Sequence, residues 1–138
     1  MPAPGGLITT LLTPYGGAMK FTFADSDANL VRSYAPGRLA VAGQTREDSV
    51  LLTARTLESW PVSKAGKLTE NHFEAILAHR PEVVLLGTGE HQVMVPPRLY
   101  RRLAESGIGV EVMATDAAVR TFNVLVSEDR RVLGALIV

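Results

Sequence analysis

The pattern that most constrains the fold is the alternation of strand-like and helix-like segments in the second half of the chain. Short runs of β-branched residues and leucine predict strands, and apolar residues spaced three and four apart predict helices. By these rules strands are expected at 82–86, 108–113 and 131–138, and helices at 97–105 and from Thr115 onward. This β-α-β-α-β order predicts an α/β layer whose first two strands are parallel and joined by a right-handed crossover.

The first half of the chain predicts antiparallel strands. Three strands are expected there, at 29–34, 38–42 and 49–54. The first two flank the turn dipeptide Pro36-Gly37, which predicts a hairpin, and residues 43–48 are expected to form a further turn.

A helix is expected at 69–79, with Thr69 as its N-cap, between the two halves. Residues 1–27 are rich in glycine, proline and threonine, which predicts an irregular leader with a short strand at 19–23. This leader is expected to be part of the same domain as residues 28–138, a single α/β domain with a mixed sheet to which the first half contributes the antiparallel strands.

Composition narrows the classes of function. The chain has 138 residues, and its 14 basic and 14 acidic side chains cancel, which disfavours a nucleic-acid-binding protein. The absence of cysteine excludes disulfides, thiolate catalysis and cysteine-bound zinc. No apolar run approaches the ~20 residues of a membrane span and no signal segment is evident, so the cytoplasm is the expected location.

The segment Gly87-Thr88-Gly89 is the first candidate site, because it follows an expected strand and precedes an expected helix. Phosphate-binding loops lie at such positions, where glycines expose main-chain N–H groups. The dinucleotide-binding pattern GxGxxG is incomplete, since Gln92 stands in place of its third glycine. A tight turn at the strand end is therefore favoured, and a phosphate site is the alternative.

Glu111 and Arg120 are the second candidate pair. Glu111 lies in an expected inner strand, where an unpaired carboxylate is costly, and Arg120 on the following helix is its expected partner. A structural ion pair is favoured, and the alternative is a small anionic or polar ligand at the carboxyl ends of the strands. The candidate ligand-binding residues are Gly87, Thr88, Gly89, Glu111, Thr115, Arg120 and Asn123.

Neither a catalytic centre nor a metal site is predicted. No nucleophile has an adjacent base in the pattern that covalent catalysis requires. His72 and His79 are seven residues apart, too far for a helical metal-binding pair, and His91 stands in an expected loop. We therefore expect no catalytic residue, no metal and no cofactor.

Several motifs occur in a specific order after residue 82. They are VVLLGTG at 83–89, the Pro96-Pro97 pair, GIGVEVMATDAAVRTFNVL at 107–125 and SEDRRVLGALIV at 127–138. In these motifs the chain resembles a family of small proteins of unknown function from bacteria and archaea, whose mitochondrial relative is assembly factor 3 of respiratory complex I. Many members of that family carry cysteine where this chain has Val119, so no thiol-based role can apply here.

The resemblance implies a three-layer α/β fold with a central mixed sheet, in which the last strand runs antiparallel to its neighbours. It also implies no established enzymatic activity, no known cofactor and a role in binding a protein partner. A non-enzymatic assembly module is thus the favoured hypothesis. The alternative is a binder of a small anion or phosphate-bearing ligand, or an enzyme, with its site at the strand ends. A homo-oligomer is left open.

Overall fold

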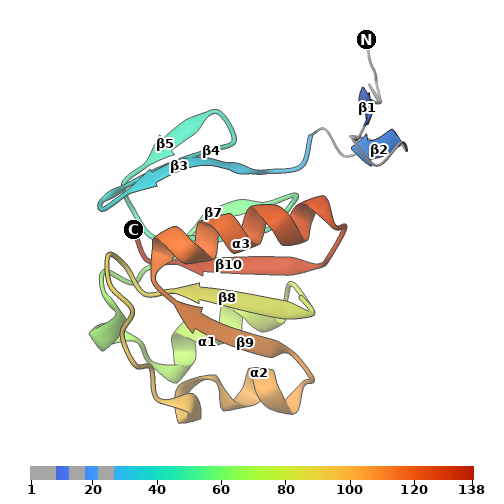
Figure 1. Ribbon diagram of the computed structural model, residues 1–138. Coiled ribbons are helices and arrows are strands. Elements are labelled where there is room, and N and C mark those ends of the chain that lie inside the picture. The colour runs from blue at the N-terminus through green and yellow to red at the C-terminus, as the bar shows by residue number, and fades with distance from the viewer. Residues whose placement is uncertain (1–8, 13–17, 22–26) are drawn as a thin grey trace.

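The computed structural model describes residues 9–12, 18–21 and 27–138, and a five-stranded sheet forms its centre (Figure 1). The order of its strands is β7 (Leu57–Ser59), β6 (Val50–Leu52), β10 (Val132–Leu136), β8 (Val83–Gly87) and β9 (Gly109–Met113). β8 is parallel to both β9 and β10, whereas β6 is antiparallel to both β10 and β7. The predicted mixed sheet and its parallel pair of strands are confirmed.

The resemblance implied that the last strand runs antiparallel to its neighbours, and the structure shows that this is only partly correct. β10 is antiparallel to β6 on one side but parallel to β8 on the other. The reason is α3 (Thr115–Ser127), which carries the chain from the end of β9 back across the sheet. A strand that follows such a helical crossover starts at the same edge as the strand before it, and therefore runs parallel to it.

A separate three-stranded sheet contains β3 (Val31–Ala35), β4 (Arg38–Val41) and β5 (Gln44–Arg46). The predicted hairpin is confirmed, since β3 and β4 are antiparallel and a two-residue turn joins Ala35 to Arg38. The hairpin does not join the central sheet, however, so only β6 and β7 supply that sheet's antiparallel strands.

The turn predicted at 43–48 is wrong, because β5 occupies Gln44–Arg46 and pairs with β4. The actual turn is the two-residue loop Ala42-Gly43, whose φ angles are 55° and 72°. Positive φ at both central residues is what a tight hairpin between twisted strands requires. Alanine seldom adopts this conformation, so only one of the two turn residues, Gly43, is of a type that predicts such a turn.

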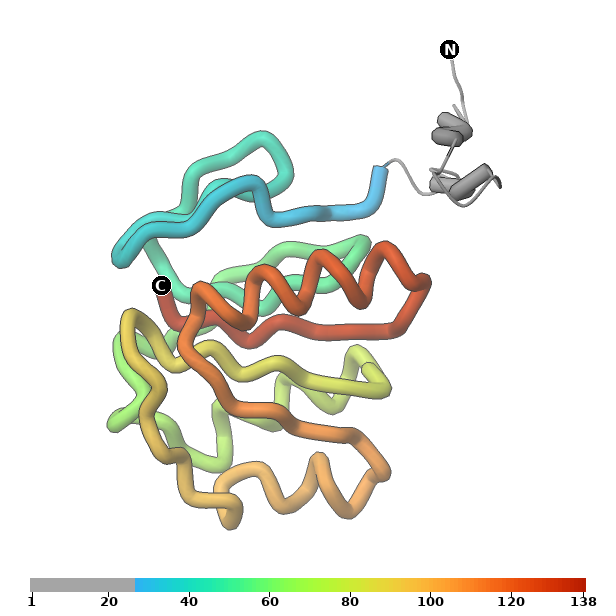
Figure 2. The backbone as a smooth tube through the Cα atoms, in the orientation of Figure 1, coloured from blue at the N-terminus to red at the C-terminus, as the bar shows by residue number. Residues whose placement is uncertain are grey.

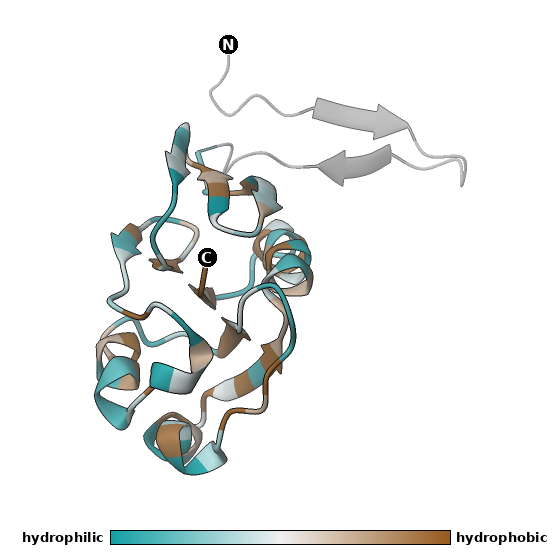
Figure 3. Ribbon diagram, turned by 90° about the vertical axis from the view of Figure 1, so that its left-hand side faces the viewer, coloured by the Kyte–Doolittle hydropathy of each residue, from teal (hydrophilic) through white to brown (hydrophobic). Residues whose placement is uncertain are grey.

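The molecule has three layers (Figures 1 and 3). α1 (Glu70–Leu77) and α2 (Arg101–Glu105) pack on one face of the central sheet through a cluster that includes Phe73, Ile76 and Leu103. α3 and the three-stranded sheet cover the other face through Phe122, Leu39 and their neighbours. All five residues of β8 are buried, as expected for a strand covered on both faces. The predicted three-layer α/β class is confirmed.

The helical predictions hold with changes at their ends. α1 follows Thr69, whose main-chain N–H donates to His72 Nδ1 at 3.0 Å and so forms part of a capping box. The segment predicted as a helix at 97–105 begins as a 3-10 helix, Pro97–Tyr100, and continues as α2. A further 3-10 turn spans Ala65–Lys67.

Two short strands are described in the leader, β1 (Thr9–Leu12) and β2 (Ala18–Phe21), and they pair antiparallel. β2 corresponds to the strand predicted at 19–23, of which residues 22 and 23 lie outside the described residues. The rest of the predicted irregular leader up to residue 26 also lies outside them.

Asp48 links the two sheets. Its carboxylate accepts hydrogen bonds from Arg46 Nε at 2.9 Å and Nη2 at 2.8 Å on β5, and from Ser59 Oγ at 2.6 Å on β7. These bonds, with the Arg46 guanidinium as the largest cause, hold the pKa of Asp48 well below its usual range.

Asp48→Asn is expected to reduce the free energy of unfolding at pH 7 by less than about 1 kcal/mol, because the Asp48 side chain is half-exposed and water screens its charge. A carboxyl whose pKa is lower in the folded state stabilises the fold above its unfolded pKa of about 4, and this effect fades as the pH falls toward the folded value. Urea unfolding of the wild type and of Asp48→Asn at pH 7 and at about pH 2 should therefore show a difference in the free energy of unfolding that becomes smaller at the lower pH. A difference that becomes larger would contradict this account.

Arg80 has a φ of 48° and is thus in the left-handed region that favours glycine. Arg80→Gly is expected to raise the free energy of unfolding by about 0.5–1 kcal/mol, since it removes the strain that Cβ imposes there. The matched control is His79→Gly on the preceding residue, which is not among those with positive φ, and it should destabilise the protein. Urea unfolding measures both, and a loss of stability in Arg80→Gly would refute the prediction.

Candidate functional site

The carboxyl ends of β8 and β9 bring together Gly87, Gly89 and Thr115, three of the predicted site residues. Thr115 is the first residue of α3 rather than its cap, because Ala114 occupies the N-cap position. Its hydroxyl turns back toward the sheet, accepts a hydrogen bond from the Gly89 N–H at 2.8 Å and donates to the Ile137 carbonyl at 2.8 Å. Thr115 is fully buried, so these hydrogen bonds connect the first residue of α3 to the loop after β8 and to the residue after β10 inside the protein.

Gly87 permits this close approach of α3 to the sheet. A Cβ at position 87 would lie 2.7 Å from Thr115 Oγ1, closer than real Cβ atoms approach, and 3.1 Å from Thr115 Cα. The glycine predicted as part of a phosphate loop therefore has a packing role, which favours the tight-turn interpretation of this segment.

Thr88 fixes the loop that follows β8. Its hydroxyl donates to the His91 carbonyl at 2.7 Å and accepts from the Val93 N–H at 3.1 Å, and its own N–H donates to the Met113 carbonyl at 2.9 Å. The residue is 5% exposed. The polar atoms of Thr88 are thus bonded to the chain itself rather than presented to a ligand.

Glu111 and Arg120 do not form the expected pair. β9 is an edge strand, not an inner one, so the Glu111 side chain is exposed and needs no partner. The carboxylate beside Arg120 is that of Asp116, one helical turn earlier, at 3.5 Å with both side chains exposed. Of the predicted set, the structure therefore brings Gly87, Gly89 and Thr115 into direct contact, and Glu111 and Arg120 remain on the surface.

Asn123 connects α3 to the three-stranded sheet. Its side-chain Oδ1 accepts from the Val31 N–H and its Nδ2 donates to the Val31 carbonyl, both at 2.8 Å. This bidentate contact satisfies both main-chain groups of the first residue of β3. Asn123 thus holds β3 against α3.

Asn123→Ala is expected to lower the free energy of unfolding by about 1–3 kcal/mol, because both polar groups of the buried Val31 lose their partner. Faster amide exchange along β3 and β4 should accompany the loss. The control Ser127→Ala removes only a hydroxyl that donates to the Asn123 carbonyl within α3, and it should change stability by less than about 0.5 kcal/mol. Equal effects of the two variants would argue against the contact.

Tyr34 is a residue that the sequence did not single out. Its hydroxyl is buried and has no hydrogen-bond partner among the described residues. Burial raises its pKa, and the negative charges of Glu90 and Asp116 raise it further; the Thr115 hydroxyl opposes this rise without reaching hydrogen-bond geometry. The phenol is therefore a neutral group beside the predicted strand-end site, and nothing in its sequence neighbourhood signals that placement.

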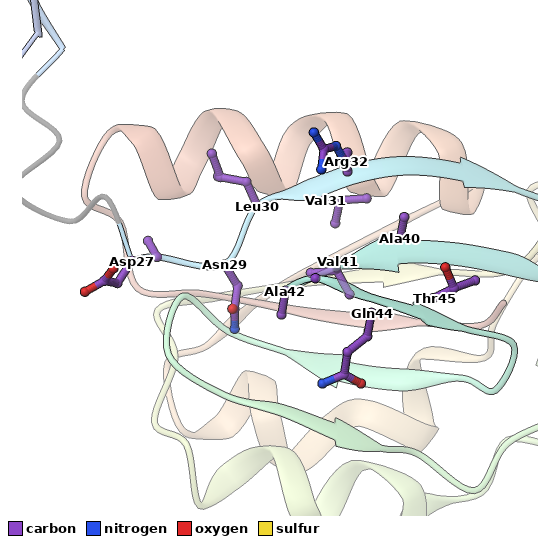
Figure 4. A pocket seen from close by; sticks show the side chains of 12 residues that line it. Asp27, Asn29, Leu30, Val31, Arg32, Ala40, Val41, Ala42, Gln44 and Thr45 are labelled. Atoms are coloured by element: carbon purple, nitrogen blue, oxygen red, sulfur yellow. The ribbon is translucent and has the colours of Figure 1, made fainter.

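A pocket of about 520 Å³ opens at one end of the three-stranded sheet (Figure 4). It is lined by residues 27–32 and 40–45. Leu30 and Arg32 extend to one side of it in Figure 4, and Asn29 and Gln44 to the other. The Asn29 amide donates to two main-chain carbonyls of the β6–β7 turn, so it holds this segment in place.

Neither a metal cluster nor a membrane-spanning helix is found in the described part of the chain. No three histidine or acidic side chains there are grouped so that they could hold a metal ion. No helix over these residues is long and apolar enough to cross a bilayer.

Comparison with known proteins identifies relatives over most of the chain. A family model described as "Protein of unknown function (DUF498/DUF598)" matches residues 31–137. A Francisella tularensis protein named "13 kDa major membrane protein" is 33% identical over 103 residues, which cover 73% of this chain and 84% of the relative. A Bos taurus protein named "NADH dehydrogenase [ubiquinone] 1 alpha subcomplex assembly factor 3" is 32% identical over 112 residues; the match covers 80% of this chain but only 61% of that relative.

Solved structures share the fold. A Bordetella parapertussis protein is 36% identical with a TM-score of 0.74, and the match covers 79% of this chain and 94% of that one. A Xanthomonas campestris protein is 40% identical with a TM-score of 0.72, and the match covers 80% and 84%. The alignment therefore extends over the three-layer domain.

Proposed function

The chain belongs to the DUF498/DUF598 family of proteins of unknown function, and from its relatives we propose that it is a non-enzymatic protein-binding module that assists the assembly of a larger complex. The observation that carries the proposal is the 32% identity to the cattle assembly factor over 112 residues. Because the chain spans about six tenths of that relative, the proposal concerns the shared domain.

Features of the strand ends support a binding role over a catalytic one. The hydroxyls of Thr88 and Thr115 are bonded to the chain itself, so neither is poised as a nucleophile. The loop that Thr88 fixes presents Met94, which is 93% exposed, beside the half-exposed Val93. Exposed methionine on an ordered loop is a feature of protein-binding surfaces, where methionine is enriched.

Deletion of the gene from the organism that encodes it tests the proposal. We expect less assembled NADH dehydrogenase on native gels and lower NADH:quinone reductase activity in membranes, both restored when the chain is expressed again. The amounts of the individual subunit transcripts serve as the control, since an assembly role leaves them unchanged. Unaltered assembly after deletion would overturn the proposal, as would a purified chain that turns over a metabolite and retains no protein partner.

The alternative stays a prediction: a binder of a small anion or phosphate-bearing ligand, or an enzyme, with its site at the carboxyl ends of the strands. The exposed, separate positions of Glu111 and Arg120 lend it no support. A cytoplasmic location and a homo-oligomer stay predictions as well, and cell fractionation and light scattering would test them.

A further inference from the structure

A pocket of about 410 Å³ lies at the amino-terminal ends of the parallel strands, the edge opposite the predicted site. Three connections meet there, those leading into β8, β9 and β10, and all three turn at the same side of the sheet (Figure 2). Because β10, β8 and β9 are adjacent in the sheet, their entry loops form one continuous wall. Its lining includes Leu77, Arg80, Glu82, Gly107, Ile108 and Arg131.

The pocket carries excess positive charge. Among the described residues no carboxylate forms an ion pair with the guanidinium of Arg80 or of Arg131. The one acidic residue of the lining, Glu82, accepts from the Arg131 main-chain N–H at 3.0 Å and from Arg130 Nε at 3.0 Å. The Glu82 carboxylate thus forms an ion pair with Arg130 and also feels the charge of Arg131, and the Arg131 N–H together with these charges lowers its pKa. One carboxylate therefore faces the three guanidinium groups of Arg80, Arg130 and Arg131, which leaves a positive excess around the pocket.

The other polar groups around the pocket are already bonded. The N–H groups of Gly107 and Ile108 donate to carbonyls of α2, and Ser106 Oγ donates to the Arg102 carbonyl at 2.9 Å. No nest of free main-chain N–H groups, which phosphate sites commonly use, is thus available among these residues. The donors that remain are guanidinium N–H groups of Arg80 and Arg131, of which only Arg131 Nε is bonded within the described part of the chain, to the Arg80 carbonyl. The flat guanidinium fork matches the geometry of a carboxylate.

Arg80 is held there at a conformational cost. Its φ of 48° is one that glycine adopts without strain, and its carbonyl accepts from Arg131 Nε at 3.4 Å. Strained main chain at a residue that lines a cavity is a feature of binding sites. Leu77 and the buried Ile108 add an apolar surface beside the two guanidinium groups.

We propose that this pocket binds a carboxylate between the guanidinium groups of Arg80 and Arg131, with the short aliphatic part of the ligand against Leu77 and Ile108. The site is distinct from the predicted strand-end site, and it does not depend on the proposed assembly role. The carboxylate has two sources with the same chemistry, a free dicarboxylic acid or an acidic side chain of a polypeptide.

Titration followed by amide NMR shifts tests the proposal with three probes at equal ionic strength: glutarate, a blocked Glu-Glu dipeptide and inorganic phosphate. We expect saturable shifts confined to residues 77–82, 106–108 and 130–131 with glutarate or the dipeptide. The tighter of these two identifies the source of the carboxylate, and either result supports the site. Binding of phosphate as tight as that of both carboxylates would overturn it, as would the absence of saturable shifts.

Arg80→Gly separates binding from folding, because it removes the guanidinium while relieving the strained main chain. We expect at least about tenfold weaker carboxylate binding with a melting temperature no lower than that of the wild type. Arg131→Gln should weaken binding similarly, and the control Arg38→Gln, an exposed arginine at the start of β4, should leave it unchanged. Undiminished affinity in Arg80→Gly and Arg131→Gln would refute the assignment.

Discussion

Thr115→Val is expected to lower the free energy of unfolding by about 2–4 kcal/mol, although valine has nearly the same shape as threonine. The substitution leaves two buried main-chain groups, the Gly89 N–H and the Ile137 carbonyl, without their hydrogen-bond partner. Each such group costs about 1–3 kcal/mol. Thr115 is fully buried, so water cannot replace the hydroxyl without opening the junction between β8 and α3.

Two further variants make the test specific. Thr115→Ser keeps the hydroxyl and should recover most of the lost stability, leaving a deficit of about 1 kcal/mol for the missing methyl group. Thr121→Val removes a hydroxyl that donates to the Ala117 carbonyl within the same helix at 2.9 Å and has the weak acceptor Met113 Sδ, at 3.9 Å, as a further partner, so it should cost less than about 1 kcal/mol. Urea unfolding measures all three. If Thr115→Val and Thr121→Val were equally stable, the junction would not depend on this hydroxyl.

The sequence predicted the elements whose signal is local and periodic. The run at 82–86 predicted the strand found as β8, and the apolar spacing after Thr115 predicted the helix found as α3. β5 was missed because its turn relies on a positive φ at Ala42, which the residue type does not signal. β7 was missed because a three-residue edge strand with one half-buried residue has almost no pattern.

The sequence predicted that some of the candidate residues lie close together, but not what their polar groups bond to. Parallel strands bring their carboxyl ends together, so residues 87–89 and 115 could be expected to meet. Which atoms bond to which depends on contacts between distant residues, such as Asn123 with Val31, 92 positions apart in the chain. Side-chain chemistry alone did not reveal that Thr115 and Asn123 satisfy main-chain groups of other elements. The same limit hid the pocket at Arg80 and Arg131, since three separate loops form it.

Phe122→Ala is expected to have the largest effect of any single substitution considered, a loss of about 3–5 kcal/mol. The side chain is fully buried between α3 and the central sheet, where it belongs to the core shared with the three-stranded sheet. A Cβ at Gly134 on β10 would lie 3.4 Å from Phe122 Cδ1, so the ring packs directly against the strand where that strand has no side chain. Smaller neighbours cannot fill the resulting cavity without moving the main chain of β10.

The single tryptophan allows this loss to be measured as unfolding of the whole domain. Trp60 is 2% exposed and lies in the core on the opposite face of the central sheet from Phe122. Because a domain of this size usually unfolds in one step, Trp60 fluorescence should report the Phe122→Ala transition at a much lower urea concentration than in the wild type. Val124→Ala, two residues along the same helix and 54% exposed, should change the free energy of unfolding by less than about 0.5 kcal/mol. An unshifted Trp60 transition in Phe122→Ala would mean that the two faces of the sheet unfold separately.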